Sequence, residues 1–334
     1  MRRRDLIGIG GSAGALPALV ELLQNFSPSA GASVFVVLHR STESEHLAAI
    51  LGKATHLEVC EPEDGDVLRE NCVYLGSADA HLSIGKGHIH LRRGPRENNF
   101  RPAIDPLFRS LAVFGSTRAT GVILSGYLDD GAAGARAILS TGGGLLVQDP
   151  AEALSPSMPR AAISAVGEPE AIRPAADIGR LLSDLVSEAA EPHREADPAI
   201  RLELMIAGLE KAKMRSEEKL GDLSPYNCPD CNGVLWEISD GPMTRYRCHT
   251  GHAYTSAVLQ SRQEQMLERS LFDSLRACRE RANFVRQLAE RDPSNAERWR
   301  ARANGYEEDC ELLEGLIQSR QGKHEGPGAD TIAS

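Results

Sequence analysis

Residues 5–14 read D-L-I-G-I-G-G-S-A-G, a short apolar run that passes into a glycine-rich turn. The apolar run predicts a β-strand, and the alanine- and leucine-rich stretch 15–25 that follows predicts a helix. The glycines of the turn allow the backbone to change direction sharply between the two elements. Ser12 is the side chain here that can act as a nucleophile, and the spacing Gly10-x-Ser12-x-Gly14 predicts the strand–turn–helix geometry of a nucleophile elbow.

The same letters fit a second pattern. The run Gly8 to Ala13 matches G-x-G-x-x-A, a dinucleotide-binding fingerprint that needs an acidic residue at the end of the next strand, about 20 residues further on. The next apolar run, S-V-F-V-V-L at 33–38, ends in His39 instead, which argues against nucleotide binding. A tight structural turn is a third interpretation, because short glycine patterns recur by chance.

The composition limits the classes of protein to consider. A chain of 334 residues that is 41% hydrophobic and 25% charged can bury a full core and is expected to hold more than one domain. Its net charge of −10 argues against nucleic acid or anionic lipid as the main partner. Seven cysteines, three of them clustered late in the chain, indicate a reducing compartment and a metal site rather than a disulfide framework.

The N-terminal residues show no signal peptide, because they contain positive charge but no apolar core segment. No apolar run in the sequence approaches the roughly 18 residues that a membrane helix needs. We therefore expect a cytoplasmic protein with no membrane insertion.

Apolar strand-like runs alternate with helical stretches from residue 5 to about residue 185. This alternation predicts an α/β fold with a doubly wound, mostly parallel sheet covered on both faces. The segment 81–91 departs from it, because two alternating runs joined by G-K-G predict an antiparallel hairpin. The expected strands are 6–9, 33–38, 73–75, 121–124 and 145–148, and the expected helices lie near 15–25, 45–53, 105–114, 131–140 and 175–188.

Three residues with complementary chemistry each follow one of these strands. Ser12 follows the first, His39 follows the second, and Asp130 lies in S-G-Y-L-D-D-G at 125–131 after another. Working residues of an open α/β sheet gather at the carboxyl ends of its strands, and a nucleophilic serine needs a base and a carboxylate that orients the base. We therefore expect Ser12, His39 and Asp130 to form a catalytic triad. The alternatives are a structural histidine, and a helix N-cap formed by the Asp129–Asp130 pair.

With these motifs in order, the stretch from Ile7 to about Val186 resembles the catalytic domain of CheB, the chemotaxis protein-glutamate methylesterase. The motifs that carry the resemblance are G-I-G-G-S-A-G-A at 8–15, V-V-L-H at 36–39, V-Y-L at 73–75 with His81, R-P-A-I-D-P-L-F at 101–108, V-I-L-S-G-Y-L-D-D-G at 122–131, and Q-D-P at 148–150 with M-P-R at 158–160. The family's nucleophile, base and orienting aspartate fall on Ser12, His39 and Asp130. The resemblance implies a hydrolase that removes methyl groups from γ-glutamyl methyl esters of receptors, and in some members deamidates glutamine. It implies no cofactor for catalysis.

Several positions depart from the family's pattern or leave their role open. The receiver domain usual in these enzymes is not expected here, because the strand before Ser12 begins at residue 5. Tyr127 and Leu128 stand where the family has methionine and glycine, which affects rate and substrate fit more than reaction type. Arg101 is expected either to bind a carboxylate or to cap local carbonyls, and Asp105 is expected to cap the helix 106–114.

The second half of the chain contains a candidate metal site. Two close pairs, C-P-D-C at 228–231 and C-H-T-G-H at 248–252, flank two strand-like runs joined by Asp240-Gly241, which predicts a β-hairpin. Four thiolate or imidazole ligands suit a closed, structural zinc site, so we expect a zinc-ribbon-like module. The expected ligands are Cys228, Cys231, Cys248 and His252. His249 is the alternative fourth ligand, although it is adjacent to Cys248 and less able to turn back to the same ion.

Two long helices, 255–290 and 296–321, are expected at the C-terminal side of the metal site, broken at Asp292-Pro293. Their apolar faces predict a helical hairpin, packed on itself or on a partner; the expected faces are Leu259, Met266, Leu271, Leu275 and Cys278 on one helix and Leu312, Leu313, Leu316 and Ile317 on the other.

The expected domains are 1–187 (methylesterase), 188–221 (linker and polar helix, the helix at about 199–219), 222–254 (zinc-ribbon-like), 255–321 (helical hairpin) and 322–334 (disordered tail).

Two functional hypotheses follow from the sequence. In the first, the chain is a methylesterase of chemotaxis or a related two-component signal transduction pathway, acting on a methylated chemoreceptor-like protein, with a C-terminal module that binds a signalling partner. In the second, the chain is a signalling scaffold whose catalytic site has drifted and whose zinc and helical module binds the partner. Intact Ser12, His39 and Asp130 favour the first.

Overall fold

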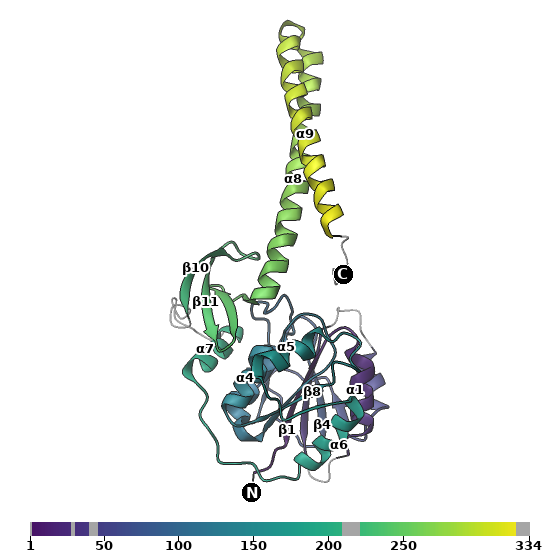
Figure 1. Ribbon diagram of the computed structural model, residues 1–334, viewed down its shortest axis with the longest axis vertical. Coiled ribbons are helices and arrows are strands. Elements are labelled where there is room, and N and C mark those ends of the chain that lie inside the picture. The colour runs from purple at the N-terminus through teal and green to yellow at the C-terminus, as the bar shows by residue number, and fades with distance from the viewer. Residues whose placement is uncertain (1, 28–30, 40–45, 209–220, 325–334) are drawn as a thin grey trace. The chain divides into compact units, whose positions relative to one another are not determined.

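The structure is a computed structural model that describes residues 2–27, 31–39, 46–208 and 221–324 (Figure 1). The chain divides into two compact units, 1–259 and 260–334. The first unit contains an α/β domain and a second, smaller sheet, and the second contains most of a helical hairpin. In the part of the chain described, no helix has the length and apolar character that a membrane span requires.

The α/β domain is built on a seven-stranded sheet in which every pair of neighbours is parallel, in the order β3-β4-β2-β1-β7-β8-β9. The strands are β1 (Leu6–Gly11), β2 (Ser33–Leu38), β3 (Glu58–Cys60), β4 (Cys72–Leu75), β7 (Ala119–Ile123), β8 (Gly144–Gln148) and β9 (Ala171–Arg173). The predicted α/β fold is confirmed. The two edge strands, β3 and β9, were not predicted.

Helices cover both faces of this sheet: α1 (Ala15–Gln24), α2 (Leu47–Gly52), α3 (Ile104–Ser110), α4 (Ala132–Ser140), α5 (Ser157–Val166) and α6 (Ala175–Leu185). The helix predicted near 105–114 is α3 followed by a π-helical turn, Leu111–Gly115. Helix α5 was not predicted. The antiparallel hairpin predicted at 81–91 is confirmed as β5 (His81–Ile84) paired with β6 (Ile89–Arg92).

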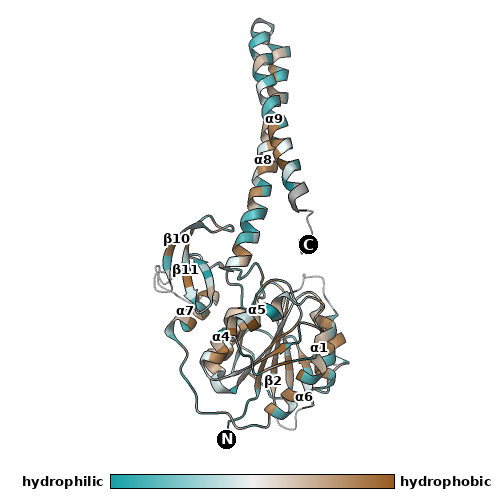
Figure 2. Cartoon of the chain, viewed as in Figure 1, coloured by the Kyte–Doolittle hydropathy of each residue, from teal (hydrophilic) through white to brown (hydrophobic). Residues whose placement is uncertain are grey.

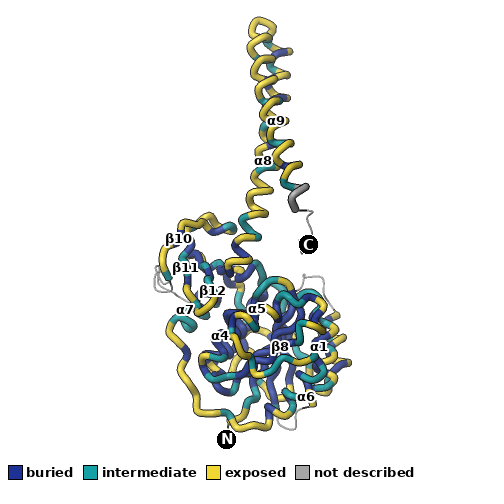
Figure 3. Tube along the Cα trace, in the orientation of Figure 1, coloured by how far each residue is buried: buried dark blue, intermediate teal, exposed yellow. Residues whose placement is uncertain are grey.

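The strands of the sheet are largely hydrophobic (Figure 2) and buried (Figure 3). Both faces of the sheet are covered, and the strands contribute alternate residues to two cores. Val34 and Val36 of β2 pack on the side of α1, α2 and α6, whereas Phe35 and Val37 pack on the side of α3, α4 and α5. This is why the strands read as continuous apolar runs rather than as alternating ones. At Gly10 a Cβ would lie 2.5 Å from the Ile104 side chain, so glycine there lets α3 approach the sheet closely.

The second sheet of the first unit has four antiparallel strands in the order β10-β11-β12-β13. They are β10 (Asp222–Asn227), β11 (Val234–Asp240), β12 (Met243–Cys248) and β13 (Ala253–Thr255). The predicted hairpin is confirmed as β11–β12, which turns at Gly241 with φ +58°. The structure adds a strand on either side of it. We call these four strands the C-terminal sheet.

The segment between the two sheets lies along the α/β domain rather than free of it. Thr117 Oγ1 donates to the Glu191 carbonyl at 2.6 Å, and Ser116 Oγ accepts from the Arg194 N–H at 2.8 Å. The predicted polar helix begins as α7 (Pro198–Ala207), whose N-cap Asp197 accepts from the Ala199 N–H at 2.7 Å. The rest of that predicted helix, 209–219, lies outside the described residues.

A buried ion cluster joins α7 and the C-terminal sheet to the α/β domain. Glu203 of α7 accepts two hydrogen bonds from Arg245, at 2.7 and 2.8 Å. Arg247 binds both Glu203, at 2.9 Å, and Glu97, at 3.0 Å. Arg109 of α3 pairs with the same two carboxylates. The five side chains are at most 10% exposed, and Asp240, which also pairs with Arg245, brings a third carboxylate to the three arginines.

The predicted helical hairpin is confirmed as α8 (Ser256–Arg291) and α9 (Ala296–His324), joined by a 3-10 turn at Pro293–Asn295. Leu275, Cys310 and Ile317 form its core, with Leu271, Cys278 and Leu313 around them. Met266, Leu312 and Leu316 of the predicted apolar faces are exposed, so they do not pack within the hairpin. Helix α9 continues past the expected end at 321, and 325–334 lie outside the described residues.

Candidate active site

Ser12 lies in the turn between β1 and α1, as the sequence predicts. The turn needs glycine at Gly14, the N-cap of α1, because φ there is +76°. The Ser12 N–H donates to the Ser125 carbonyl at 2.9 Å, and the Ser125 hydroxyl donates to the Ala13 carbonyl at 2.7 Å. These bonds fix the Ser12 turn to the loop that follows β7. A Cβ on Gly126 would stand 3.0 Å from the Ser12 Cβ, so glycine keeps space beside the hydroxyl.

His39 and Asp130, which are far apart in the sequence, form a hydrogen-bonded pair. His39 Nε2 lies 2.7 Å from Asp130 Oδ2, and their side chains are 3% and 0% exposed. The Phe100 ring stacks on the imidazole with centroids 3.5 Å apart. The backbone N–H of His39 donates to the Gly11 carbonyl at 3.1 Å, which places the imidazole at the same end of the sheet as Ser12. The interpretation of Asp130 as a simple N-cap is therefore not needed.

Among the described residues, the second ring nitrogen of His39 has no hydrogen-bond partner. Because a carboxylate only accepts, Nε2 carries the proton that it shares with Asp130, and Nδ1 carries the lone pair. Nδ1 is buried. In the part of the chain described, no hydrogen bond joins it to Ser12 Oγ, although the two residues follow the neighbouring strands β1 and β2. An imidazole with one nitrogen anchored and the other available is the arrangement that a general base needs.

Asp130 is held ionised by the donors around it. Burial opposes ionisation, but the hydrogen bond from His39 and those from the Ile104 N–H, at 2.7 Å, and the Asn98 amide, at 2.9 Å, outweigh it. Together they keep the pKa of Asp130 below its ordinary value. A charged carboxylate at this point stabilises the imidazolium that forms when His39 accepts a proton.

Asp105 does not cap its own helix, so that prediction is wrong. The N-cap of α3 is Ala103, and Asp105 Oδ1 instead accepts from the Gly134 N–H in the first turn of α4, at 2.7 Å. Its Oδ2 accepts from the Asn98 amide at 2.9 Å. Burial, followed by the charge of Asp130, raises the pKa of Asp105 to about 7.

The loop after β7 contacts the C-terminal sheet. Asp129 Oδ1 accepts from the Thr255 hydroxyl at 2.8 Å, and burial raises the pKa of Asp129 to about 6. Leu128, where the resemblance implied glycine, has a left-handed backbone with φ +61° and packs on the core of the C-terminal sheet. Tyr127 is exposed.

Arg101 and His81, both within motifs of the resemblance, make local contacts. Arg101 donates to Asp79 through Nε and Nη2, at 2.9 and 2.6 Å, and to the Gly94 carbonyl through Nη1 at 2.7 Å. It therefore satisfies nearby groups, in line with the second interpretation offered for it. His81 is buried between the Pro95 carbonyl and the Ala103 N–H, and burial lowers its pKa.

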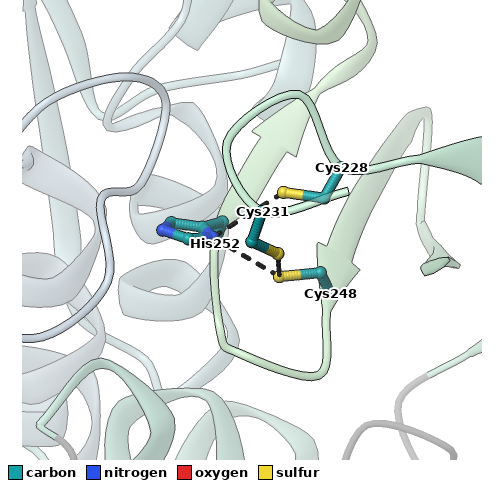
Figure 4. Close-up of side chains that lie close together, drawn as sticks. All are labelled: Cys228, Cys231, Cys248 and His252. Atoms are coloured by element: carbon teal, nitrogen blue, oxygen red, sulfur yellow. Dashed lines mark hydrogen bonds between the residues drawn. The ribbon is translucent and has the colours of Figure 1, made fainter. Parts of the chain in front are cut away.

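Three cysteines and one histidine converge in the C-terminal sheet (Figure 4). The ligand atoms of Cys228, Cys231, Cys248 and His252 all lie within 4.8 Å of one another. Cys231 Sγ is 3.6 Å from Cys248 Sγ, and His252 Nδ1 is 3.6 Å from the sulfurs of Cys228 and Cys248. A tetrahedral zinc ion with Zn–S bonds of about 2.3 Å needs edges of about 3.8 Å between its sulfurs, so this set has the chemistry and the spacing for zinc.

The surroundings of this cluster distinguish between the two candidate histidines. His252 brings a ring nitrogen into the group, whereas His249 packs edge-to-face on Trp236 with centroids 6.4 Å apart. Tyr254 lies behind the cluster, with its hydroxyl 3.1 Å from Cys228 Sγ and 2.6 Å from Asp230. The geometry thus favours His252 as the fourth ligand.

Two residues at the site were not predicted from the sequence. Asn98 bridges Asp105 and Asp130, and Thr255 reaches Asp129. Asn98 and Asn99 have left-handed backbones, with φ +50° and +73°, and the sequence does not reveal this conformation. Their contacts depend on how the C-terminal sheet packs, and no spacing pattern encodes that.

Comparison with known proteins places this site in a family. The family model described as CheB methylesterase matches residues 7–182. A protein-glutamate methylesterase/protein-glutamine glutaminase 2 from Anaeromyxobacter dehalogenans is 35% identical over 184 residues, 55% of this chain and 54% of that protein. A protein-glutamate methylesterase/protein-glutamine glutaminase from Maricaulis maris is 35% identical over 182 residues, 53% of this chain and 45% of that protein. The chain thus spans about half the length of the curated relatives it matches.

A solved structure agrees with the sequence relatives. The crystal structure of the Thermotoga maritima CheB methylesterase catalytic domain aligns with a TM-score of 0.51 and 28% identity, and covers 55% of this chain and 98% of that one. The match extends over the α/β domain, the part that carries Ser12, His39 and Asp130. The chain belongs to the CheB methylesterase family.

Proposed function

We propose that this protein is a serine hydrolase that removes methyl groups from γ-glutamyl methyl esters of chemoreceptor-like proteins. One observation carries the proposal: the His39 imidazole is anchored to Asp130 at 2.7 Å through Nε2, while its buried Nδ1 has no hydrogen-bond partner among the residues that the structure describes. The names of the relatives support the substrate class. Receptor signalling helices as substrate would place the enzyme in the cytoplasm, in chemotaxis or a related two-component pathway.

In the first half of the reaction, Ser12 Oγ attacks the ester carbonyl carbon while His39 Nδ1 accepts the hydroxyl proton. The resulting imidazolium is stabilised by Asp130 through Nε2. Collapse of the tetrahedral intermediate breaks the bond to the methoxy group, which takes the proton from His39 and leaves as methanol. Ser12 is then esterified to the glutamyl side chain.

In the second half, His39 removes a proton from water, and the water oxygen attacks the acyl carbon. Collapse returns the proton to Ser12 and releases glutamate. Each half develops negative charge on the carbonyl oxygen. The Ala13 N–H, which has no protein acceptor among the residues that the structure describes, is the proposed donor to that oxygen. Loss of one such donor typically costs about 3 kcal/mol of transition-state stabilisation.

The same acyl-enzyme forms from a glutamine side chain, with ammonia leaving in place of methanol. The names of both relatives include protein-glutamine glutaminase. We therefore include deamidation of receptor glutamines in the proposed activity.

The four-residue cluster is proposed to hold zinc in a structural role. All four positions of a tetrahedron are supplied by protein, so the ion has no open position for a substrate or a water molecule. When bound, zinc would fix the turns of the C-terminal sheet. The hydrolysis assigned to Ser12, His39 and Asp130 needs no metal.

The helical hairpin formed by α8 and α9 is proposed to bind a signalling partner.

Release of methanol tests the proposed activity. The substrate is a receptor signalling fragment carrying methyl-labelled glutamyl esters, incubated with wild-type protein, Ser12→Ala or Ser140→Ala. We expect wild type and Ser140→Ala, whose hydroxyl bonds only within α4, to release methanol at the same rate, and Ser12→Ala to release none above background. Equal rates for wild type and Ser12→Ala would leave the scaffold hypothesis in place of the enzyme.

A further inference from the structure

Both N–H groups and the carbonyl oxygen of the Asn98 side chain make hydrogen bonds, and the C-terminal sheet supplies one of the partners. Its Nδ2 donates to Asp105 Oδ2 and to Asp130 Oδ1, both at 2.9 Å. Its Oδ1 accepts from the Thr255 N–H at 3.2 Å. Asn98 is only 3% exposed, so water does not compete with these partners.

These partners allow the amide only one orientation. Asp105 and Asp130 both need a donor, so the NH₂ end must face them. If the amide were turned over, its oxygen would face two carboxylates, an arrangement that costs free energy in a buried site. The Thr255 N–H favours the correct orientation because it requires the oxygen at the opposite end. Strand β13 therefore selects the orientation in which Asn98 supports Asp130.

The sheet holds the backbone of Asn98 as well. The Asn98 N–H donates to the Ala253 carbonyl at 2.8 Å, and the Ala253 N–H donates to the Arg96 carbonyl at 3.3 Å. Glu97 forms an isolated parallel bridge with Ala253, and its carboxylate pairs with Arg247. The segment carrying Asn98 is thus bound along β13 by main chain and side chain.

Two neighbours of Asp130 also contact the sheet directly. Asp129 accepts from the Thr255 hydroxyl at 2.8 Å. Leu128 keeps a left-handed backbone, φ +61°, that is unfavourable for leucine, and its side chain packs on the cluster formed by Cys228, Leu235, Cys248, Tyr254, Val258 and Leu259. Residues 128, 129 and 130 are therefore each held by the C-terminal sheet, directly or through Asn98.

The proposed metal ligands lie at the other end of β13. The strand begins directly after His252 and ends at Thr255, so only Ala253 and Tyr254 lie between this ligand and the active-site contacts. Tyr254 contacts Cys228 Sγ at 3.1 Å, and Arg247 donates to the Gly251 carbonyl in the turn between the ligands at 2.9 Å. The position of Thr255 therefore depends on the order of this turn.

We propose that the C-terminal sheet positions residues of the esterase site. The metal cluster orders strand β13, β13 orients the Asn98 side chain, and Asn98 positions Asp130 beside His39. Asn98 and Thr255 are positioning residues and do not touch the substrate. The proposal rests on the proposed function in assigning Asp130 to the triad. Bound zinc would then affect catalysis by ordering strand β13, without contacting the reacting atoms.

The charged groups around Asp130 show what Asn98 does electrostatically. Asp130 faces His39 from β2, Asp105 from α3, and Asp129 beside it in its own loop. Its charge also acts on His81 of β5, and the pair Glu97–Arg109 acts on Asp105. The Asn98 NH₂ group is the neutral donor that Asp105 and Asp130 share. Without it, the two carboxylates repel each other with one donor fewer, and Asp130 becomes easier to protonate.

The carboxyl carbon of Asp130, followed by ¹³C NMR as pH is varied, reports on this support without any turnover. Asp130→Asn identifies the resonance. The test variant is Asn98→Gly, because glycine accepts the φ of +50° at this position and removes only the amide. We expect the Asp130 titration to move up by about one pH unit, the cost of losing a hydrogen bond to a charged group. We also expect kcat for methyl ester hydrolysis to fall by about tenfold or more with KM unchanged.

Two further measurements distinguish the effect of the C-terminal sheet on Asp130 from the effect of the Asn98 amide. Removal of the metal from the full chain with a chelator is expected to move the Asp130 titration in the same direction, and addition of zinc is expected to restore it. This arm decides the question if Asn98→Gly does not fold. Ser256→Ala is the matched control, because its hydroxyl bonds the Thr244 carbonyl in the same sheet but does not face the site, and it should titrate as wild type.

An Asp130 titration that is unchanged both in Asn98→Gly and after metal removal would overturn the proposal. A titration that shifts in a protein with no esterase activity would support the positioning network while rejecting the proposed function. A loss of activity in Asn98→Gly with an unshifted titration would mean that Asn98 acts other than through Asp130, and would also overturn it.

Discussion

Arg247 of the C-terminal sheet donates to Glu97 of the α/β domain at 3.0 Å, and neither side chain is more than 1% exposed. Both belong to the buried ion cluster that also contains Arg109, Arg245 and Glu203. A buried charge that loses its partner is costly, and each carboxylate of this cluster is paired with more than one arginine. The two sheets are therefore expected to unfold together rather than one after the other.

Substitution of Glu203 tests the cluster. Glu203→Gln removes the charge that Arg245, Arg109 and Arg247 share, and those Arg charges hold the pKa of Glu203 well below its usual range. We expect unfolding in urea to require about 3 kcal/mol less free energy than in wild type. Glu311→Gln, on an exposed face of α9, should be neutral. Equal stability of the two variants would show that the Glu203 charge does not stabilise the fold through its arginine partners.

Substitutions of Leu128 separate two contributions to the free energy of unfolding: the strain of its left-handed backbone and the packing of its side chain. Leu128→Ala keeps the strained φ of +61° and loses the contact with the C-terminal sheet, whereas Leu128→Gly loses the contact and relieves the strain. We expect both to be less stable than wild type in urea, with glycine more stable than alanine by about 1 kcal/mol. Alanine at least as stable as glycine would show that the backbone at 128 is not strained.

The pH dependence of stability follows from Asp105. Its pKa is raised to about 7 in the folded protein, so the folded state binds the proton more tightly than the unfolded chain does. Its contribution to stability is therefore complete below the unfolded value of about 4 and is lost as pH rises through about 7. Asp105→Asn should weaken the fall in unfolding free energy between about pH 5 and pH 8, and exposed Asp177→Asn should not. The same slope in all three proteins would show that Asp105 does not titrate in this range.

Metal content tests the four-residue cluster. Protein purified without chelator is expected to carry one zinc ion per chain, and Cys231→Ser should lose most of it because a thiolate ligand is replaced by a weak one. Cys278→Ser, within the helical hairpin, should keep its zinc. Mass spectrometry of the metals gives the ratio directly. His252→Ala should behave as Cys231→Ser, while His249→Ala should not; the reverse result would exchange the two histidines.

The sequence revealed elements whose physical cause is local. Strands β1 and β2 are continuous apolar runs because both sheet faces are covered, and α1 follows a glycine turn, so all three were predicted close to their true bounds. Strands β3 and β9 have three residues each and include charged side chains, so no apolar run marks them. Their pairing depends on β4 and β8 already being in place.

The residues of the candidate site also fall into two groups: those marked by a local sequence pattern and those whose contacts depend on packing. Ser12, His39 and Asp130 each follow a strand, and parallel topology brings strand ends together, so strand order together with the family resemblance was enough to propose them. Asn98 and Thr255 were missed because they are 157 residues apart and meet only through the packing of the C-terminal sheet. Asp105 was assigned to its own helix because caps are local by rule, whereas in the structure it caps α4.

Labelling by a fluorophosphonate probe tests the central claim, that the His39–Asp130 pair makes Ser12 nucleophilic, without depending on any substrate. An activated serine hydroxyl displaces fluoride from phosphorus and keeps the phosphonyl group, which mass spectrometry then locates. We predict one labelled peptide, carrying Ser12, with labelling abolished in Ser12→Ala, slowed by about a hundredfold in His39→Ala, and unchanged in Ser140→Ala. Labelling that persists in Ser12→Ala, or that proceeds at the wild-type rate in His39→Ala, would contradict the account.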